Sequence, residues 1–474
     1  METILSLNTV LILFAIFTGI MAVVLYLKKA FNVKSIDGFY VADRKVKSNS
    51  AAMSIAVSWI WAPALFIASS IAFDLGIAGA LWFIIPNIVC FFVFAPLAVK
   101  FRESLPNGYS IPEYFRHRYP KKESVSIAFS ITTTLFALAA IIENLVAISK
   151  LFQFYTGFSG VYAILFMTLI ALSYSLISGL KASIFTDVFQ MSVVVLIGLV
   201  LVPWSLSSIS GDGMMLSTIV SSAGSEAWLA IAFAPGLSLL FGLIGGPLGD
   251  QMFFQRAMSV PKKAIRKTLY KAGLLFAIVP IALSLFGFIG RALKDQIVVA
   301  DSELVGAVII AEYLPPIASI LFFFMMICGL ASTLDSAYCA GSSVFGRELF
   351  RIKGGSLTPK KEIRLSRYFM VFFAIFGALL ASFSRDIWYV FMTDAAIAAS
   401  GIVPILLSAF WKKQTANATF WALILGLIVG CSTSIAGHFF DAQTLAALGA
   451  PLAVVVGLFV SLILNQFSTN LRHS

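Results

Sequence analysis

The chain has 474 residues, of which 60% are hydrophobic and only 12% charged, and its mean hydropathy is +0.96. A soluble globular chain carries about twice that charged fraction, so the composition excludes one. Runs of about 20 apolar residues recur along the whole length, whereas an outer-membrane barrel would show alternating segments of about ten. The sequence therefore predicts an all-α membrane protein.

Thirteen apolar segments are long enough to cross a bilayer as helices. The first, 4–27, has no basic residue before it and no small-residue cleavage site after it, so we expect a retained span rather than a signal peptide. The others are 51–73, 77–99, 125–149, 158–179, 182–207, 226–247, 269–290, 316–346, 366–384, 387–411, 416–437 and 444–466.

Basic residues predict which ends of these spans lie in the cytoplasm. All but four of the 33 Lys and Arg fall on one side once the spans are threaded through the membrane, the exceptions being Lys150, Arg291, Lys294 and Arg385. Because basic residues gather on the cytoplasmic side, we expect the N-terminus outside, the C-terminus in the cytoplasm and the protein in the cell membrane. The net charge of +11 then reflects topology, and no nucleic-acid partner is expected.

Two predicted spans contain helix breakers. In SIAVSWIWAPALF, Pro63 has no N–H to offer the Trp59 carbonyl, so the carbonyls from Val57 to Ile60 lose their normal partners. The seventh span holds Pro235, Gly236, Gly242, Gly245, Gly246 and Pro247. The two spans lie five apart and cross in opposite directions, a pattern that marks the solute site of inverted-repeat transporters. The alternative is a pair of ordinary proline kinks.

A polar stripe runs through the ninth span, in MICGLASTLDSAYCAGSSV. Its small and hydroxyl residues recur at steps of three and four, which places them on one helix face: Gly329, Ser332, Thr333, Ser336, Ala340 and Ser343. Such a face either packs closely against another helix or supplies oxygen ligands to a desolvated cation.

Acidic residues also occur within or at the ends of spans, namely Glu143, Asp187, Asp250, Asp335 and Asp394. A carboxylate in the hydrocarbon region is costly, and we expect no Lys or Arg deep enough to pair with these. An aqueous path or a bound cation is the expected counterpart. The four cysteines and three histidines show no metal or redox spacing, so neither a disulfide nor a metalloenzyme is expected.

Four segments resemble the sodium:solute symporter family, in the same order and at the same spans. They are DGFYVADRKV, SIPEYFRHRYP, SLISGLKASIFTDVFQ and ASTLDSAYCAGSSVFGRELF. Two departures are Gly329, where the family commonly has Ala, and ISGL in place of the usual Gly-Gly.

The resemblance implies a LeuT-type fold with an inverted five-helix repeat. The chain would form one transport domain, with an extra N-terminal helix at 4–27, a first repeat at 51–207, a second at 226–411 and two further helices within 416–466. It also implies a sodium site made by the carbonyls of Val57, Ile60 and Gly329 and the hydroxyls of Ser332 and Thr333.

Within the family, SWIWAPALFIASSIAFDLGIAGALWF and GGPLGDQMFFQRAMS are most similar to the urea-active transporter branch. The implied function is sodium-coupled uptake of a small neutral or cationic solute, with urea the leading candidate and no cofactor besides the coupling ion. Trp59, Trp61, Gly242 and Gly245 are the expected solute-binding residues, and Asp187 and Glu143 the expected ion pathway.

Several alternatives stay open at this point. The solute belongs equally well to a proline or other amino-acid type of symporter, and protons are an alternative coupling ion, with Asp187 or Glu143 as carrier. A sensor or channel on the same scaffold is a further hypothesis, although no selectivity-loop repeat is present. An enzyme is not expected, because no nucleophile has a nearby base. The sequence does not decide the oligomeric state.

Overall fold

The computed structural model describes residues 3–30, 33, 35–209, 225–351, 357–384 and 386–470. Within these residues every regular element is helical, and twelve helices are long and apolar enough to cross a membrane. The predicted all-α membrane fold is therefore confirmed. Arg385, used above for the orientation, lies outside the described residues.

The long helices, in chain order, are α1 (Leu7–Leu27), α4 (Ala68–Ser104), α6 (Glu123–Thr156), α7 (Val161–Ser178), α8 (Leu180–Ile209), α11 (Leu237–Gly249), α13 (Ile265–Ala292), α15 (Pro316–Arg351), α16 (Pro359–Phe383), α17 (Ile387–Phe410), α18 (Ala416–Phe439) and α20 (Gly449–Asn470). The shorter ones are α2 (Ile36–Val41), α3 (Ser48–Ser58), α5 (Ile111–Arg118), α10 (Ser225–Ile231), α12 (Gln251–Ser259), α14 (Val305–Tyr313) and α19 (Gln443–Ala447), with single turns η1 (Ala42–Arg44), η2 (Pro63–Ile67), η3 (Ala232–Gly236), η4 (Lys262–Ala264) and η5 (Ser302–Leu304).

Thirteen predicted spans become twelve candidate membrane helices because two of them join at Gly76. The continuous helical stretch Pro63–Ser104 covers parts of the predicted spans 51–73 and 77–99. Within it, Gly76 has φ 64° and ψ −150°, a conformation that glycine tolerates and residues with a side chain rarely adopt. The direction of the chain therefore changes at Gly76, where the sequence predicts the gap between two spans.

Both predicted helix breaks are present. The helix α3 ends at Ser58, and the helical path resumes at Pro63 in the π-helical turn η2, which leads into α4. In the second break, η3 separates α10 from α11, and Ala234 has the extended angles φ −154° and ψ 115° just before Pro235. Each proline removes one backbone donor from the helical hydrogen-bond pattern, which explains why both helices break there.

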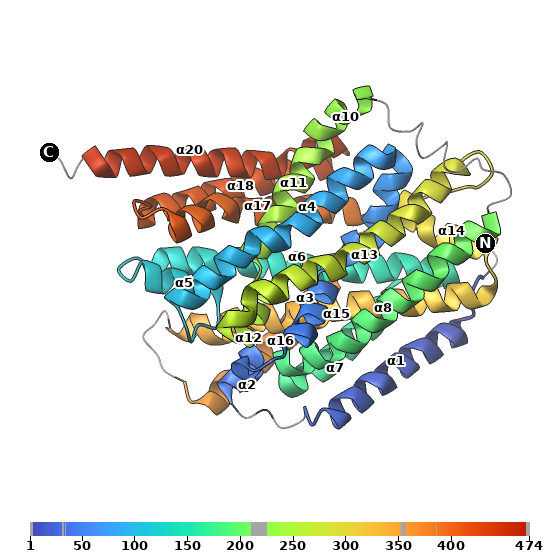
Figure 1. Cartoon of the computed structure of the whole chain (residues 1–474), viewed down its shortest axis with the longest axis horizontal. Coiled ribbons are helices and arrows are strands. Elements are labelled where there is room, and N and C mark those ends of the chain that lie inside the picture. Colours follow the sequence, from blue (N-terminus) through green and yellow to red (C-terminus); the bar gives the residue numbers. More distant parts are fainter. Residues whose placement is uncertain are drawn as a thin grey trace.

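The long helices form one bundle (Figure 1). In that view α1 lies at one edge and α18 and α20 at the other, and the two chain ends lie at opposite ends of the bundle. Helix α4 packs along α13, α11 along α17, and α15 against both α6 and α8. Helix α15 is the most deeply buried of the candidate spans, so its polar stripe is enclosed by protein on all sides. The inverted relation between segments 51–207 and 226–411 stays a prediction.

Short helices occupy the two ends of the bundle. Helices α2, α5 and α12 gather at the end that the charge count predicts to be cytoplasmic, called the inner end below (Figure 1). The turn η5 and helix α14 lie between α13 and α15 at the opposite, outer end.

Candidate ion and solute site

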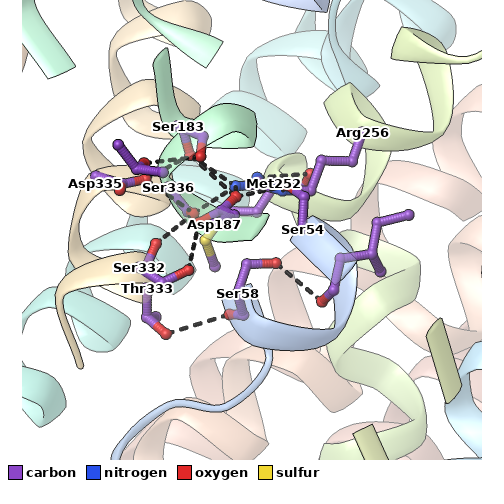
Figure 2. Close-up of polar contacts among 12 residues, drawn as sticks. Ser54, Ser58, Ser183, Asp187, Met252, Arg256, Ser332, Thr333, Asp335 and Ser336 are labelled. Carbon is purple, nitrogen blue, oxygen red and sulfur yellow. Dashed lines mark hydrogen bonds and ion pairs between the residues drawn. The ribbon is translucent and has the colours of Figure 1, made fainter. Parts of the chain in front are cut away.

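The polar stripe of α15 faces the first broken helix (Figure 2). Ser332 Oγ donates to Asp187 Oδ1 of α8 at 2.5 Å, and Thr333 Oγ1 donates to the Ser58 carbonyl oxygen at 3.3 Å. Ser58 is the last residue of α3, so Thr333 contacts the point where the helix stops. All four side chains are buried.

The predicted carbonyl ligands lie at the same junction, but they are not equally free. The Val57 carbonyl accepts from the Ile60 amide at 3.0 Å, in the final turn of α3. The Ile60 carbonyl faces α15, because a Cβ placed on Gly329 would lie 3.4 Å from that oxygen and 2.9 Å from Leu65 Cδ1. Gly329 thus permits a close approach of the two backbones that an alanine would hinder.

Asp187 forms a salt bridge with Arg256, which the sequence analysis did not foresee (Figure 2). Arg256 Nη2 lies 2.9 Å from Asp187 Oδ2, and neither side chain is exposed. Arg256 also donates to Ser54, Ser183 and Ser336 at 2.6–2.9 Å. The expectation that no basic residue lies deep enough to pair with the buried acids is therefore wrong.

The position of α12 explains this error. Arg256 follows the seventh span and was counted among the cytoplasmic loop residues, but α12 turns back and packs against α3 and α15. All residues of α12 are buried, and Asp250 caps its N-terminus by accepting from the Met252 amide at 2.7 Å. A short amphipathic stretch directly after a span was the available signal, because the apolar face of such a helix packs against the core.

A second carboxylate, Asp335, borders the same network. Its Oδ1 accepts hydrogen bonds from Ser183 and Ser336, whereas its Oδ2 has no hydrogen-bond partner among the described residues. Arg256 thus pairs directly with Asp187 and is connected to Asp335 only through the Ser183 and Ser336 hydroxyls. The network is one positive charge short of neutrality when both acids are ionised.

The first break brings Trp59 and Trp61 together. Their rings stack with centroids 4.7 Å apart, and both are buried. The two rings therefore lie on the same side of the break and form one aromatic surface. Trp61 also contacts Phe136 of α6 and Phe391 of α17, with centroid distances of 6.2 and 5.9 Å.

Two asparagines that the sequence analysis missed hold this break in place. Asn87 Oδ1 of α4 accepts from the Trp59 indole N–H at 2.9 Å, and Asn144 Oδ1 of α6 accepts from the Ala62 amide at 3.1 Å. Asn144 therefore satisfies a backbone donor that the interrupted helix leaves free. The available signal was a lone amide within each apolar run, IIPNIVC and IIENLVA.

The glycines of α11 pack against two different partners. A Cβ on Gly242 would lie 2.4 Å from Ala395 Cβ, and one on Gly245 would lie 2.8 Å from the Ala398 carbonyl, so both predicted solute-binding glycines face α17. A Cβ on Gly246 would lie 2.4 Å from Trp59 Cη2. Gly246, which was not among the predicted solute-binding residues, is the glycine of α11 that contacts the tryptophan pair.

The profile of the sodium:solute symporter family matches residues 39–426, a range that includes both broken helices and α15. The chain belongs to this family. The resemblance drawn from four short segments is thereby confirmed, and so is the expectation of a transporter rather than an enzyme.

Relatives within the family are named for different solutes. The urea active transporter of Saccharomyces cerevisiae is 26% identical over 87% of this chain, which spans 60% of the yeast protein's length. The sodium/pantothenate symporter of Haemophilus influenzae is 23% identical over 82% of each chain. A solved Na+-coupled sialic acid symporter superposes with a TM-score of 0.75 at 16% identity, covering 96% of this chain and 98% of its own. This likeness confirms the LeuT-type fold.

The two acids expected in the ion pathway of this symporter family member belong to different parts of the site. Asp187 lies in the Arg256 network at the inner side of the break. Glu143 lies on α6 beside Asn144, is fully buried, and neither of its carboxylate oxygens has a hydrogen-bond partner among the described residues. Asp394 of α17 is also buried, with its Oδ1 unpartnered among the same residues.

A cavity of about 800 Å³ lies at the outer end. Its lining includes Trp388, which contacts Phe391 with ring centroids 6.4 Å apart, and four acids, Asp74, Asp301, Glu303 and Asp386, with Lys150 as the basic residue among them. We call this cavity the outer vestibule.

Glu303 connects three elements around the vestibule. It forms an ion pair with Lys150 of α6 and accepts from the Trp388 amide at the start of α17 at 3.0 Å. Burial raises the pKa of the Glu303 carboxyl to about 7, and the nearby Lys150 charge opposes that shift. Lys150 also pairs with Asp301 at 2.7 Å, so this cluster joins η5 to α6 and α17.

Proposed function

We propose that this protein uses the inward movement of sodium to drive uptake of a small neutral or cationic solute. The observation that carries the proposal is the contact between the α15 hydroxyls and the end of α3. There, Ser332 and Thr333 face Asp187 and a freed backbone carbonyl inside a desolvated seam. Oxygen ligands of this kind suit a hard cation.

In the proposed site, sodium binds the carbonyls of Val57, Ile60 and Gly329 and the hydroxyls of Ser332 and Thr333. The ion draws the Asp187 carboxylate toward itself, because Ser332 already connects the two positions. Two cations, sodium and the Arg256 guanidinium, then compete for one carboxylate. Weakening of the Asp187 to Arg256 contact loosens α12 from α8 and prepares the inner end to open.

The solute binds beside the first break, against the ring of Trp61. Trp59 and Trp61 supply an aromatic wall, and the unpartnered carboxylate oxygens of Glu143 and Asp394 favour solutes that donate hydrogen bonds. Urea is the first solute to test, since a urea active transporter is among the relatives. An anionic solute would meet Glu143 and Asp394 and is disfavoured.

Proton coupling is the second candidate, and one observation favours it. Glu143 is buried without a hydrogen-bond partner among the described residues, which is the environment of a carboxyl that carries a proton. Under this alternative the Ser332 and Thr333 junction is a packing contact.

Uptake by the purified protein in proteoliposomes tests both candidates. Under the sodium proposal, labelled urea accumulates when an inward sodium gradient is applied and fails to accumulate when potassium replaces sodium. A panel of amides, polyamines, proline and short carboxylates then competes with the labelled solute. Uptake that follows a pH gradient without sodium establishes the proton alternative, and competition by carboxylates alone rejects the solute assignment.

We also propose that the protein lies in the cell membrane with its N-terminus outside and its C-terminus in the cytoplasm. A cysteine at Lys263 should react with a membrane-impermeant thiol reagent from the cytoplasmic side only, and one at Asp295 from the outside only. Both are placed in a background without the native Cys90, Cys328, Cys339 and Cys431. The reverse labelling would overturn the orientation.

A further inference from the structure

Glu143 and Asp394 lie on helix faces that both contact the Trp61 ring. Phe136 and Glu143, seven residues apart, share a face of α6, and Phe391 and Asp394, three residues apart, share a face of α17. Both phenylalanines contact Trp61. The two acids therefore lie on the faces that α6 and α17 turn toward Trp61.

The electrostatic surroundings of the pair are negative. The charge of Asp394 acts on Glu143, and the charge of Asp250 acts on Asp394. Three carboxylate oxygens of the pair, both of Glu143 and Oδ1 of Asp394, have no hydrogen-bond partner among the described residues. A buried carboxylate without a partner is costly unless a cation or a set of donors reaches it.

The outer vestibule has the same sign of charge. It carries four acids against one lysine, and the neighbouring Arg291 is occupied by donating to the Phe73 and Asp74 carbonyls. A cleft lined by one sign of charge concentrates ions of the opposite sign. The vestibule therefore enriches cations at the outer end of the bundle.

Aromatic rings separate the vestibule from the buried acids. Trp388 lines the vestibule and contacts Phe391, which contacts Trp61 in turn. The face of a tryptophan or phenylalanine ring attracts a cation but offers little to a neutral amide. Ring contacts thus link the vestibule lining to Trp61.

We infer that Glu143 and Asp394 form the subsite for a positively charged N–H group of the solute, so that the substrate is an organic cation of the amine, amidine or guanidine class. This inference rests on the proposed function and narrows its solute from neutral or cationic to cationic. The alternative solute is neutral urea. The Trp61 indole N–H also has no partner among the described residues and suits the carbonyl oxygen of urea. Charge on the solute distinguishes the two.

Guanidinium and urea provide the sharpest probes, since both are small planar groups that differ mainly in charge. Equilibrium binding of each, measured with the purified full-length protein in sodium and again in potassium, should show guanidinium bound at least about tenfold more tightly, the effect of a charge-assisted hydrogen bond. The isosteric variants Glu143→Gln and Asp394→Asn should each reduce guanidinium affinity at least about tenfold and change urea affinity less than about threefold.

The exposed Glu312 of α14 supplies the matched control, because Glu312→Gln removes a carboxylate outside the vestibule and should leave guanidinium binding unchanged. A cooperative thermal unfolding transition of each variant reports that it is folded. Equal or tighter binding of urea by the wild type overturns the inference, as does a guanidinium preference that survives both variants. Guanidinium preference that persists while sodium has no effect leaves the subsite standing and rejects only the sodium coupling.

Discussion

The rings of Trp59 and Trp61 stack at 4.7 Å with their planes inclined by 24°. Residues two apart on a continuous helix point about 200° away from each other, so the stack exists only because the helix stops at Ser58. Asn87 and Asn144 anchor the two ends of the interrupted segment. The aromatic wall is thus a direct product of the break that Pro63 imposes.

Gly246→Ala should disturb this wall. The new Cβ would lie 2.4 Å from Trp59 Cη2, and an overpacked core site costs about 1–3 kcal/mol or displaces the ring. We expect solute affinity to fall at least about tenfold with little change in sodium affinity, measured by equilibrium binding. Gly249→Ala is the control, because its Cβ would have its nearest contact at 3.8 Å. Equal behaviour of the two variants would show that the ring position is irrelevant.

Ser332→Ala and Thr333→Ala should each raise the sodium concentration needed for half-maximal uptake by at least about tenfold. Loss of one ligand of a desolvated cation costs on the order of 1–3 kcal/mol. The measurement is uptake into proteoliposomes over a range of sodium concentrations at fixed osmolarity. Ser342→Ala on the same helix, whose hydroxyl donates to the Cys339 carbonyl at 3.0 Å, is the control. Unchanged sodium dependence in both test variants would remove the proposed site.

Arg256→Gln should destabilise the folded protein strongly, because it leaves the Asp187 carboxylate buried and unpaired. Breaking a buried ion pair in this way costs about 3–5 kcal/mol. The thermal midpoint in detergent should fall, and the double variant Asp187→Asn with Arg256→Gln should recover at least about half of the loss, since it removes the uncompensated charge. Arg266→Gln, at an exposed residue of α13, is the control. A single variant as stable as the wild type would contradict the prediction.

How far the sequence predicts this structure depends on whether a feature is local. Apolar runs and two prolines predict the spans and both breaks, because hydrophobicity and a missing N–H act within a few residues. The burial of Arg256 was missed, since it depends on how α12 packs against helices far away in sequence. The packing of Trp59 against Gly246 was missed for the same reason, as was the packing of Gly242 against Ala395.

Glu303 should make stability depend on pH. Its pKa is raised to about 7 in the folded protein and returns to about 4.5 on unfolding, so the folded state binds the proton more tightly. Stability from this group is fully present below the unfolded pKa and decreases as the pH rises to about 7. The thermal midpoint should fall less between pH 5 and 7 in Glu303→Gln than in the wild type, with Glu312→Gln behaving as the wild type. An unchanged slope in Glu303→Gln would refute this.

The ion pairs at the two ends of the bundle differ in their access to water. Asp187 and Arg256 are fully enclosed, whereas Lys150 and Asp301 are 19% and 34% exposed at the vestibule. Dissolved salt screens charges in contact with water, with a Debye length of about 10 Å at 0.1 M, and acts far less on enclosed ones. Raising ionic strength at constant sodium therefore weakens the outer contacts selectively.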